Sequence, residues 1–248
     1  MSRILYEHPL NERIRNYLKL EHLFGQVESA QQLELQQGYS VLFTSLFAIL
    51  DSLERNDIRG DLIKDLEKLE QNLVLWSQRS DVDASALEQN LRKTVALVNQ
   101  LRSTKLPWWQ LKDDKFLSAV KQRFAIQGGS ASFDLPQLQF FLHQPATTST
   151  KTIEAWLSTL MQLKEAIALV LVFIRQRSGF ECVETESGFY QDSGEGLLLL
   201  RIELDANAQF YPTVSGNRFR YSIRFMLPCE QSGRRYSNSA TKFYLAKC

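Results

Sequence analysis

Three arginines on one face of a predicted strand are the residues of this sequence best suited to binding chemistry. They lie in SGNRFRYSIRFML, residues 215–227, where successive side chains of a strand would point to opposite faces. One face would be apolar and pack in a core, and it comprises Phe219, Tyr221, Ile223, Phe225 and Leu227. The other face would carry Arg218, Arg220 and Arg224, together with Ser222 and Met226. Because guanidinium groups bind carboxylates through two parallel hydrogen bonds, this arginine face could recognise anions.

Two interpretations of the arginine face stay open from the residues alone. Outward charges on strands also prevent edge-to-edge aggregation, and these arginines could do no more than that. If they bind a ligand, the span from Arg218 to Arg224 is about 20 Å at the rise of a strand, which suits an extended peptide with acidic and apolar side chains. Nucleic acid is the alternative ligand, but no aromatic residues alternate with the arginines on that face of the strand.

Charge is separated within the last third of the sequence. Residues 201–248 hold eight Lys or Arg and three Asp or Glu, a net charge of +5 that leaves −4 for residues 1–200. Residues 179–200 contain five acidic residues and no Lys or Arg. The formal net charge of the whole chain is only +1, so a local basic surface is favoured over a field that would coat nucleic acid or anionic lipid.

The sequence indicates no catalytic or metal-binding constellation. The three histidines, His8, His22 and His143, have no zinc-ligand spacing, and no GxSxG motif occurs. Gly128-Gly129 is not followed by the Gly-Lys-Ser/Thr of a phosphate loop, so the pair predicts a turn. We therefore expect no enzymatic activity, no cofactor and no metal.

Cysteine usage and hydropathy indicate the compartment. Cys182, Cys229 and Cys248 are widely spaced and form neither a CxxC pair nor a zinc-finger pattern. No signal peptide is indicated, and the most apolar helical run, residues 166–174, is far shorter than the ~20 residues that span a bilayer. These features predict a soluble cytoplasmic protein without a membrane partner.

Periodicity predicts the elements that must position the arginine face. Residues 1–125 read as helix throughout. Within them, leucines recur at heptad spacing in two segments, about 58–78 and 84–103, separated by the polar stretch SQRSDVDAS. This pattern predicts an antiparallel helical hairpin packed like a coiled coil. Its contact should bury Leu66, Leu69, Leu91 and Val98.

The second half of the sequence predicts a sheet backed by one long helix. Residues 127–145 contain strand-like apolar segments between turn residues, and residues 151–178 form a helix that becomes apolar on most sides. LLRIELD, the arginine strand and TKFYLAK then read as antiparallel strands. We predict an α+β fold with an α-helical domain at 1–126 and a β-domain at 127–248, in which helix 151–178 packs between the sheet and the helical domain.

Four segments of the sequence resemble those of the ZapD family of bacterial cell-division proteins. They are EHPLNERIRNYLKLEHLF, KQRFAIQGGSASFDLPQLQFFLHQP, GFYQDSG and YPTVSGNRFRYSIRFM, and they follow the family's order along nearly the whole chain. The resemblance implies a helical domain, a β-domain and a homodimer. It also implies binding to the C-terminal tail of the tubulin-like protein FtsZ and cross-linking of FtsZ filaments into bundles at the midcell division ring.

The same resemblance implies which residues bind the tail. Arg220 and Arg224 match the strand arginines of the family's basic pocket, and Arg55, in LDSLERNDIRGDL, matches a helical one. Arg218 and Arg59 are neighbours that we add from charge placement. The favoured interpretation is a non-enzymatic filament cross-linker. The alternatives are a nucleic-acid-binding protein that uses the basic strand 218–224 and an enzyme with an unrecognised site.

Overall fold

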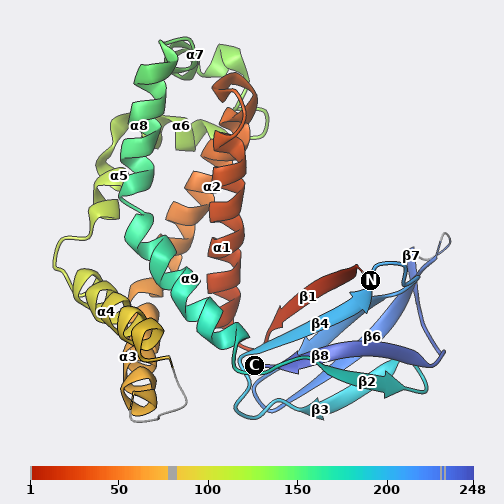
Figure 1. Ribbon diagram of the computed structural model, residues 1–248. Helices are drawn as coiled ribbons and strands as arrows, with labels where there is room; N and C mark the ends of the chain where they lie inside the picture. Colours follow the sequence, from red (N-terminus) through yellow and green to blue (C-terminus); the bar gives the residue numbers. More distant parts are fainter. Residues whose placement is uncertain (1, 78–82, 230, 232) are drawn as a thin grey trace. The chain divides into compact units, whose positions relative to one another are not determined.

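The chain folds into two compact units. The computed structural model describes residues 2–77, 83–229, 231 and 233–248, and Figure 1 labels most of their helices and strands. One unit, here called the sheet unit, combines Met1–Leu18 with Leu171–Cys248, and the other, the helical unit, is Lys19–Val170. This division differs from the expected boundary between residues 126 and 127, because the first strand pairs in the sheet unit and the helices up to Val170 pack in the helical unit.

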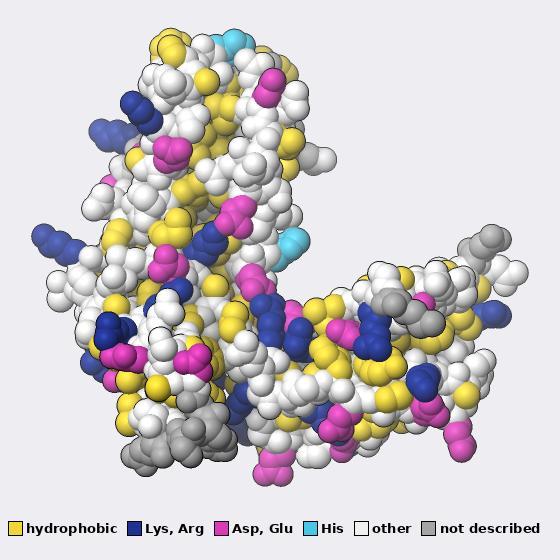
Figure 2. All heavy atoms as spheres, viewed as in Figure 1, with side chains coloured by type: hydrophobic (Ala, Val, Ile, Leu, Met, Phe, Trp, Pro, Cys, Tyr) yellow, Lys and Arg dark blue, Asp and Glu magenta, His cyan; other side chains and the backbone are white. Residues whose placement is uncertain are grey.

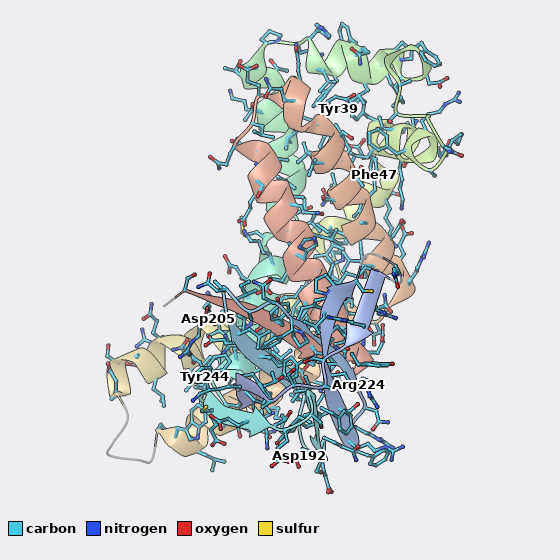
Figure 3. The ribbon with its side chains drawn as sticks, turned by 90° about the vertical axis from the view of Figure 1, so that its right-hand side faces the viewer. Tyr39, Phe47, Asp192, Asp205, Arg224 and Tyr244 are labelled. Carbon is cyan, nitrogen blue, oxygen red and sulfur yellow. The ribbon has the colours of Figure 1, made fainter. Side chains whose placement is uncertain are left out.

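Aromatic side chains form the centre of the helical unit. Neighbouring rings of this centre lie 5.0–6.4 Å apart between centroids. They belong to Phe43, Phe47 (labelled in Figure 3), Phe116, Phe124, Phe141 and Trp156.

The helices along the chain are α1 (Glu12–Gln31), α2 (Leu35–Arg55), α3 (Ile58–Trp76), α4 (Ala84–Leu101), α5 (Gln110–Asp113), α6 (Lys115–Phe124), α7 (Pro136–Leu142), α8 (Ala146–Ser158) and α9 (Met161–Arg175), with 3-10 turns η1 (Pro107–Trp109) and η2 (Ser132–Asp134). Both α1 and α9 continue into the sheet unit.

Helices α3 and α4 form the predicted antiparallel hairpin (Figure 1). Arg59, at the start of α3, donates to the backbone oxygens of Leu101 (2.7 Å) and Ser103 (3.1 Å) at the end of α4, and Arg102 pairs with Glu67. Among the predicted contact residues Leu66, Leu69 and Val98 are buried, and Leu91 is half-buried. The connecting residues 78–82, within SQRSDVDAS, lie outside the described residues.

Residues 127–145 form turns and two short helical segments instead of strands, so the prediction of strand-like segments there was wrong. They contain η2 and α7, and Pro136 occupies the first position of α7, where its missing N–H breaks no helical hydrogen bond. Leu138, Phe141 and Leu142 are buried at helical spacing. His143 is the C-cap of α7, and its N–H donates to Gln139 O (3.1 Å).

The long helix predicted at 151–178 is two helices, α8 and α9, bent by 54° at a short break. At this break, backbone hydrogen bonds join residues three apart, as in a 3-10 helix, instead of residues four apart, as in an α-helix. Thr159 donates its N–H (3.2 Å) and its hydroxyl (2.6 Å) to Trp156 O, and Leu160 N donates to Leu157 O (3.0 Å). Because the Thr159 hydroxyl satisfies a carbonyl that a continuous helix would use, the sequence ends one helix and begins another.

The sheet unit packs two antiparallel sheets around one core. One sheet has the strand order β1-β4-β8-β2 and the other β3-β6-β5, with β7 also pairing with β6. Apolar side chains of both sheets meet between them, including Ile202 and Leu204 of β4, Ile223 and Phe225 of β6, and Phe243 of β8. The strands are β1 (Arg3–Pro9), β2 (Glu181–Thr185), β3 (Phe189–Ser193), β4 (Leu199–Asp205), β5 (Tyr211–Gly216), β6 (Arg220–Cys229), β7 (Gly233–Tyr236) and β8 (Thr241–Lys247).

Strand β1 contradicts the prediction that residues 1–125 are helical throughout. It pairs antiparallel with β4, from Arg3 opposite Asp205 to Pro9 opposite Leu199. Ile4 and Leu5 are both 44% exposed, so the segment lacks the in-and-out alternation that signals a strand locally. Its partner is about 190 residues away, and the pairing that stabilises β1 therefore leaves no local pattern.

Two ion-pair groups fix the elements of the sheet unit. Glu7 of β1 accepts hydrogen bonds from Arg175 at the end of α9 (2.7 and 2.9 Å) and from Arg201 of β4 (3.0 Å). Lys247 of β8 donates to Asp192 of β3 (2.5 Å) and so joins the two sheets. The first group ties the end of α9 to one sheet, and the second ties that sheet to the other.

None of the described helices is, on its own, long and apolar enough to cross a bilayer, although the bent pair α8 and α9 passes that test by length and composition when taken together.

Candidate functional site

The outer face of β6 carries the predicted arginines. Tyr221, Ile223 and Phe225 point inward and are at most 1% exposed, which confirms the predicted apolar face for these three. Arg220 and Arg224 are exposed on the opposite face. Between them on the same face, Ser222 is half-buried.

Three side chains of the predicted strand depart from the alternation. Phe219 was expected inward but is 64% exposed, because β6 begins only at Arg220 and the side-chain oxygen of Asn217 accepts from Phe219 N (2.9 Å) in the preceding turn. Met226 was expected outward but is 5% exposed, and Leu227 is half-buried. The alternation breaks there because the strand beside β6 changes from β3, which pairs up to Arg224, to β7, which pairs from Met226 onward.

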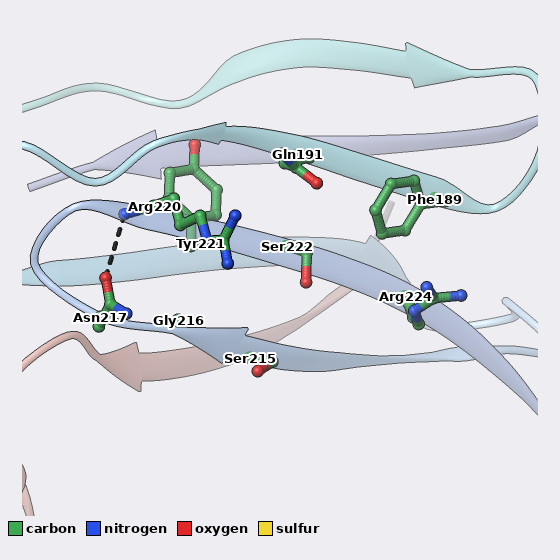
Figure 4. A pocket seen from close by; sticks show the side chains of 9 residues that line it. All are labelled: Phe189, Gln191, Ser215, Gly216, Asn217, Arg220, Tyr221, Ser222 and Arg224. Atoms are coloured by element: carbon green, nitrogen blue, oxygen red, sulfur yellow. Dashed lines mark hydrogen bonds between the residues drawn. The ribbon is translucent and has the colours of Figure 1, made fainter.

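Arg220 and Arg224 lie at an open hollow of about 390 Å³ on this face (Figure 4). Register places Gln191 of β3 and Ser215 of β5 on either side of Ser222, so the floor between the two arginines is polar. The lining residues are Phe189, Gln191, Ser215, Gly216, Asn217, Arg220, Tyr221, Ser222 and Arg224. The hollow therefore combines two cationic side chains with amide and hydroxyl groups.

The arginines of this face have no acidic partner within the described residues. No carboxylate there lies within 4.0 Å of a guanidinium nitrogen of Arg218, Arg220 or Arg224. Asp192, on the neighbouring strand, instead accepts from Lys247 (2.5 Å) and from the Tyr190 hydroxyl (3.1 Å), and the hydrogen bond from Lys247 is the main cause that lowers the pKa of Asp192. No carboxylate of the described residues therefore compensates the positive charge at the hollow.

Two aromatic rings contact the guanidinium of Arg224. Its central carbon lies 4.6 Å from the ring centroid of Phe189, on β3, and 5.2 Å from that of Tyr236, on β7. These strands meet end to end beside β6 at Gly188, whose φ is +62° and where an added Cβ would lie 2.3 Å from Ser237 O. A glycine is required at that junction, which brings Phe189 and Tyr236 to the same arginine.

Phe189 and Tyr236 were missed by sequence reasoning. The absence of aromatic residues on the arginine face holds for β6 itself, but the structure brings these two rings to that face from other strands. The signal available in the sequence was Gly188, a residue typical of tight backbone junctions, directly before the aromatic Phe189. The register that sets Phe189 opposite Arg224 depends on pairing across about 35 residues of chain, and no local pattern specifies it.

Arg218 lies in the turn before β6. Its guanidinium carbon is 4.6 Å from the ring centroid of Phe219, and both side chains are exposed. The Asn217 side-chain oxygen also accepts from Arg220 N (3.2 Å), so the turn is fixed directly at the first arginine of the strand. Arg218 therefore extends the basic surface beyond the residues that line the hollow.

Arg55 and Arg59 belong to the helical unit. Arg55 is the exposed last residue of α2 and has no ion-pair partner among the described residues. Arg59 is half-buried, and its Nε and Nη2 donate to Leu101 O and Ser103 O, at and just beyond the end of α4. Of the five predicted arginines, the structure brings Arg220 and Arg224 to one hollow, places Arg218 beside it, and holds the other two in the helical unit.

The described residues contain no group of three or more His, Cys, Asp or Glu side chains that could hold a metal ion. The three cysteines are unbridged: Cys182 is exposed, Cys229 is half-buried and Cys248 is buried. The arrangement that the sheet unit offers for chemistry is accordingly the basic hollow.

The fold and the hollow define an α+β protein that presents a cationic surface on a two-sheet β-domain. A family model described as "ZapD: Cell division protein" matches residues 18–224. The chain belongs to this family, and a role in cell division follows from that membership.

Individual relatives agree over nearly the full length. The chain is 40% identical over 246 residues to "Cell division protein ZapD" of Idiomarina loihiensis, covering 99% of this chain and 96% of that protein. It is 38% identical over 225 residues to the protein of the same name from Yersinia enterocolitica (91% and 90% covered), and 40% over 221 residues to that of Aliivibrio fischeri (89% of each). The alignment thus includes both compact units.

Proposed function

We propose that this protein binds the acidic C-terminal tail of FtsZ in the hollow of the sheet unit and cross-links FtsZ filaments at the division ring. The observation that carries the proposal is the pair Arg220 and Arg224, which are exposed, without acidic partners among the described residues, and at one hollow. Membership of the ZapD family supplies the cell-division context. No catalytic step is part of the proposal.

The geometry of the hollow suits an extended acidic peptide. Arg220 and Arg224 are four residues apart on one strand, about 13 Å between Cα atoms at the rise of a strand. Two anionic groups of one peptide can therefore each reach an arginine. Gln191, Ser215 and Ser222 between them can bond to the backbone of the peptide, since amides and hydroxyls both donate and accept.

The test is a titration of charge-reversal variants with a labelled FtsZ tail peptide. Arg220→Glu and Arg224→Glu should each weaken binding by more than tenfold, because loss of a charge-assisted pair costs ~1.5–3 kcal/mol and reversal adds repulsion. Arg177→Glu is the matched control, since Arg177 is an exposed arginine of the same unit that does not line the hollow. Each variant must melt as the wild type does, and wild-type binding should weaken between 50 and 300 mM salt.

The outcome for Arg55→Glu extends the test to the helical unit. We propose that Arg55 also contacts the tail, with Arg218 and Arg59 as weaker contributors, so Arg55→Glu should weaken binding as well. Wild-type affinity in folded Arg220→Glu and Arg224→Glu variants would remove the hollow as the tail site. Wild-type affinity in Arg55→Glu alone would restrict the site to the sheet unit.

Cross-linking requires two tail sites on one particle, and we propose a homodimer. One tail contact of ~1 μM is worth only about −8 kcal/mol, whereas two linked sites can raise avidity by ~10²–10⁴. A two-fold dimer is the commonest way to place two equal sites on one assembly. Sedimentation at micromolar concentration should show a dimer, and a monomer that still bundles filaments would contradict this.

Nucleic acid is the competing ligand that the same experiment tests. Acidic and basic side chains are interspersed on the faces visible in Figure 2, and the net charge is +1, which disfavours a long polyanion. A single-stranded oligonucleotide should therefore fail to displace the tail peptide at equal charge concentration. Displacement with a steep salt dependence would favour the nucleic-acid alternative.

A further inference from the structure

We infer that Arg224 and Arg220 have different roles: Arg224 is a guanidinium that Phe189 and Tyr236 orient in advance to take one carboxylate in a fixed geometry, and Arg220 supplies positive charge without that constraint. The inference rests on the proposed binding of an acidic peptide and deepens it. It assigns Phe189 and Tyr236 as positioning residues of the site.

The contacts of the two arginines carry the distinction. The guanidinium carbon of Arg224 lies 4.6 Å and 5.2 Å from two ring centroids, whereas no aromatic ring contacts the Arg220 guanidinium among the described residues. The tight junction at Gly188, between β3 and β7, sets the positions of Phe189 and Tyr236 beside β6. Tyr236 is 61% exposed, and its ring lies against the Arg224 guanidinium.

Stacking and carboxylate binding use different parts of a guanidinium. The face of the planar group lies on an aromatic ring, while its N–H donors point outward in the plane and match the two oxygens of a carboxylate. Arg224 can therefore keep its ring contacts while it binds. Because the rings already restrict the side chain, less conformational freedom is lost when the ligand arrives, which strengthens binding.

Lysine substitutions separate the two roles. Lysine keeps the charge but has no planar fork, so it cannot reproduce both stacking and two-pronged binding. We expect Arg224→Lys to weaken binding of the FtsZ tail peptide by about tenfold or more, and Arg220→Lys to weaken it by less than about threefold. Equal losses at both positions would overturn the assignment of different roles.

Paired ring substitutions test the positioning residues. Phe189→Leu and Tyr236→Leu remove a ring and keep an apolar side chain, and together they should weaken binding roughly five- to thirtyfold. Phe189→Tyr and Tyr236→Phe keep the rings and should bind within about twofold of the wild type. Phe219→Leu is the control, since that exposed ring contacts Arg218 instead.

A double-mutant cycle excludes a merely structural effect. If the rings act through Arg224, then Phe189→Leu and Tyr236→Leu should cause no further loss in the Arg224→Ala background. An undiminished further loss there, or unchanged binding in the folded double ring variant while Arg224→Ala alone weakens it, would overturn the inference and leave the proposed function standing. Unchanged binding in Arg224→Ala would remove this arginine from the site and overturn the inference, while the proposed function would then depend on the outcome for Arg220→Glu.

Discussion

Arg55 and Arg59 are four residues apart in the sequence but differ in what their guanidinium groups contact. Arg59 donates to Leu101 O, a carbonyl at the end of α4 that the helix leaves without a partner, and to Ser103 O just beyond it, while Arg55 makes no such contact with the described residues. We expect Arg59→Ala to lower the free energy of unfolding by ~1–2 kcal/mol and, as a weaker contributor to the site, to weaken affinity for the tail peptide by only about two- to threefold. Urea denaturation and peptide titration measure the two effects.

The complementary variant is Arg55→Ala. As an exposed arginine without an ion-pair partner among the described residues, it should change the free energy of unfolding by no more than ~0.5 kcal/mol. Its effect should appear in peptide affinity alone. The assignment of Arg59 to helix capping is wrong if Arg59→Ala unfolds like the wild type and binds the peptide more weakly.

At the scale of single residues, the sequence predicted β6 well over its central part. Period-two alternation correctly separates Tyr221, Ile223 and Phe225 from the arginines because both neighbouring strands pair with β6 there. It fails at Phe219 and Met226, where a turn and a change of neighbouring strand decide the environment. The burial of a side chain that depends on which strand pairs alongside cannot be predicted from the sequence of its own strand.

The helical hairpin of α3 and α4 depends on its buried leucines. Leu66 has no exposed surface, and Leu66→Ala should therefore cost ~2–5 kcal/mol of unfolding free energy, from lost burial and the cavity left behind. Leu75 lies on the same helix but is 61% exposed, and Leu75→Ala should stay within about 0.5 kcal/mol. Urea denaturation of both variants checks this, and equal costs would show that the heptad seam is not the stabilising contact.

The ion pair between Asp192 and Lys247 makes the joint between the two sheets sensitive to pH. The hydrogen bond between them lowers the pKa of Asp192 and raises that of Lys247. Its stabilisation is therefore lost as pH falls through the pKa of Asp192, below ~3.9, and as pH rises through that of Lys247, above ~10.4. Both side chains are over a third exposed, so solvent screening limits the effect to about 1 kcal/mol or less.

Asp192→Asn tests this joint. It should lower stability slightly at neutral pH and make the acid limb of the stability curve less steep, as followed by thermal melting between pH 3 and 7. Asp134→Asn is a comparison carboxylate in the helical unit. An acid limb as steep as in the wild type would show that Asp192 titrates without linkage to folding.

At the scale of elements, the sequence predicted the helices with a regular apolar repeat and missed the points where a helix is interrupted. The heptad pattern correctly gave α3 and α4, since the same spacing recurs over five turns in each helix. The break between α8 and α9 was missed, because apolar periodicity continues across Thr159 while a side-chain hydroxyl ends the helix. The strand-like reading of residues 127–145 failed similarly, because Pro136 begins a short helix, α7.

If bundling requires two tail sites on one dimer, chains that cannot bind the tail should suppress bundling by forming mixed dimers with wild-type chains. When wild-type protein is mixed with an equal amount of folded Arg220→Glu/Arg224→Glu protein and subunits exchange, about one quarter of dimers keep two intact tail sites. Low-speed pelleting of FtsZ polymers should then fall well below half of the wild-type value at the same total protein. Pelleting that falls only in proportion to the wild-type fraction would indicate that single sites suffice.

At the scale of the whole molecule, fold class could be predicted but the grouping of segments could not. Helical and strand periodicities sufficed for an α+β protein. The sheet unit, however, combines the first 18 residues with the last 78, and the pairing of β1 with β4 has no counterpart in local composition. Arg220 and Arg224 lie on the outer face of β6, as the local alternation predicted, while the positions of Phe189 on β3 and Tyr236 on β7 depend on how the sheet is assembled.

The union of the two chain ends in one sheet has a consequence for synthesis. A ribosome that adds 5–20 residues per second needs roughly 10–40 s to make the ~190 residues between β1 and its partner strand. During that time the helical unit, which lies between them in sequence, can fold completely, whereas β1 waits with its backbone donors and acceptors exposed. A nascent chain arrested after residue 190 should therefore protect α2–α8 from proteolysis but leave residues 3–9 cleavable.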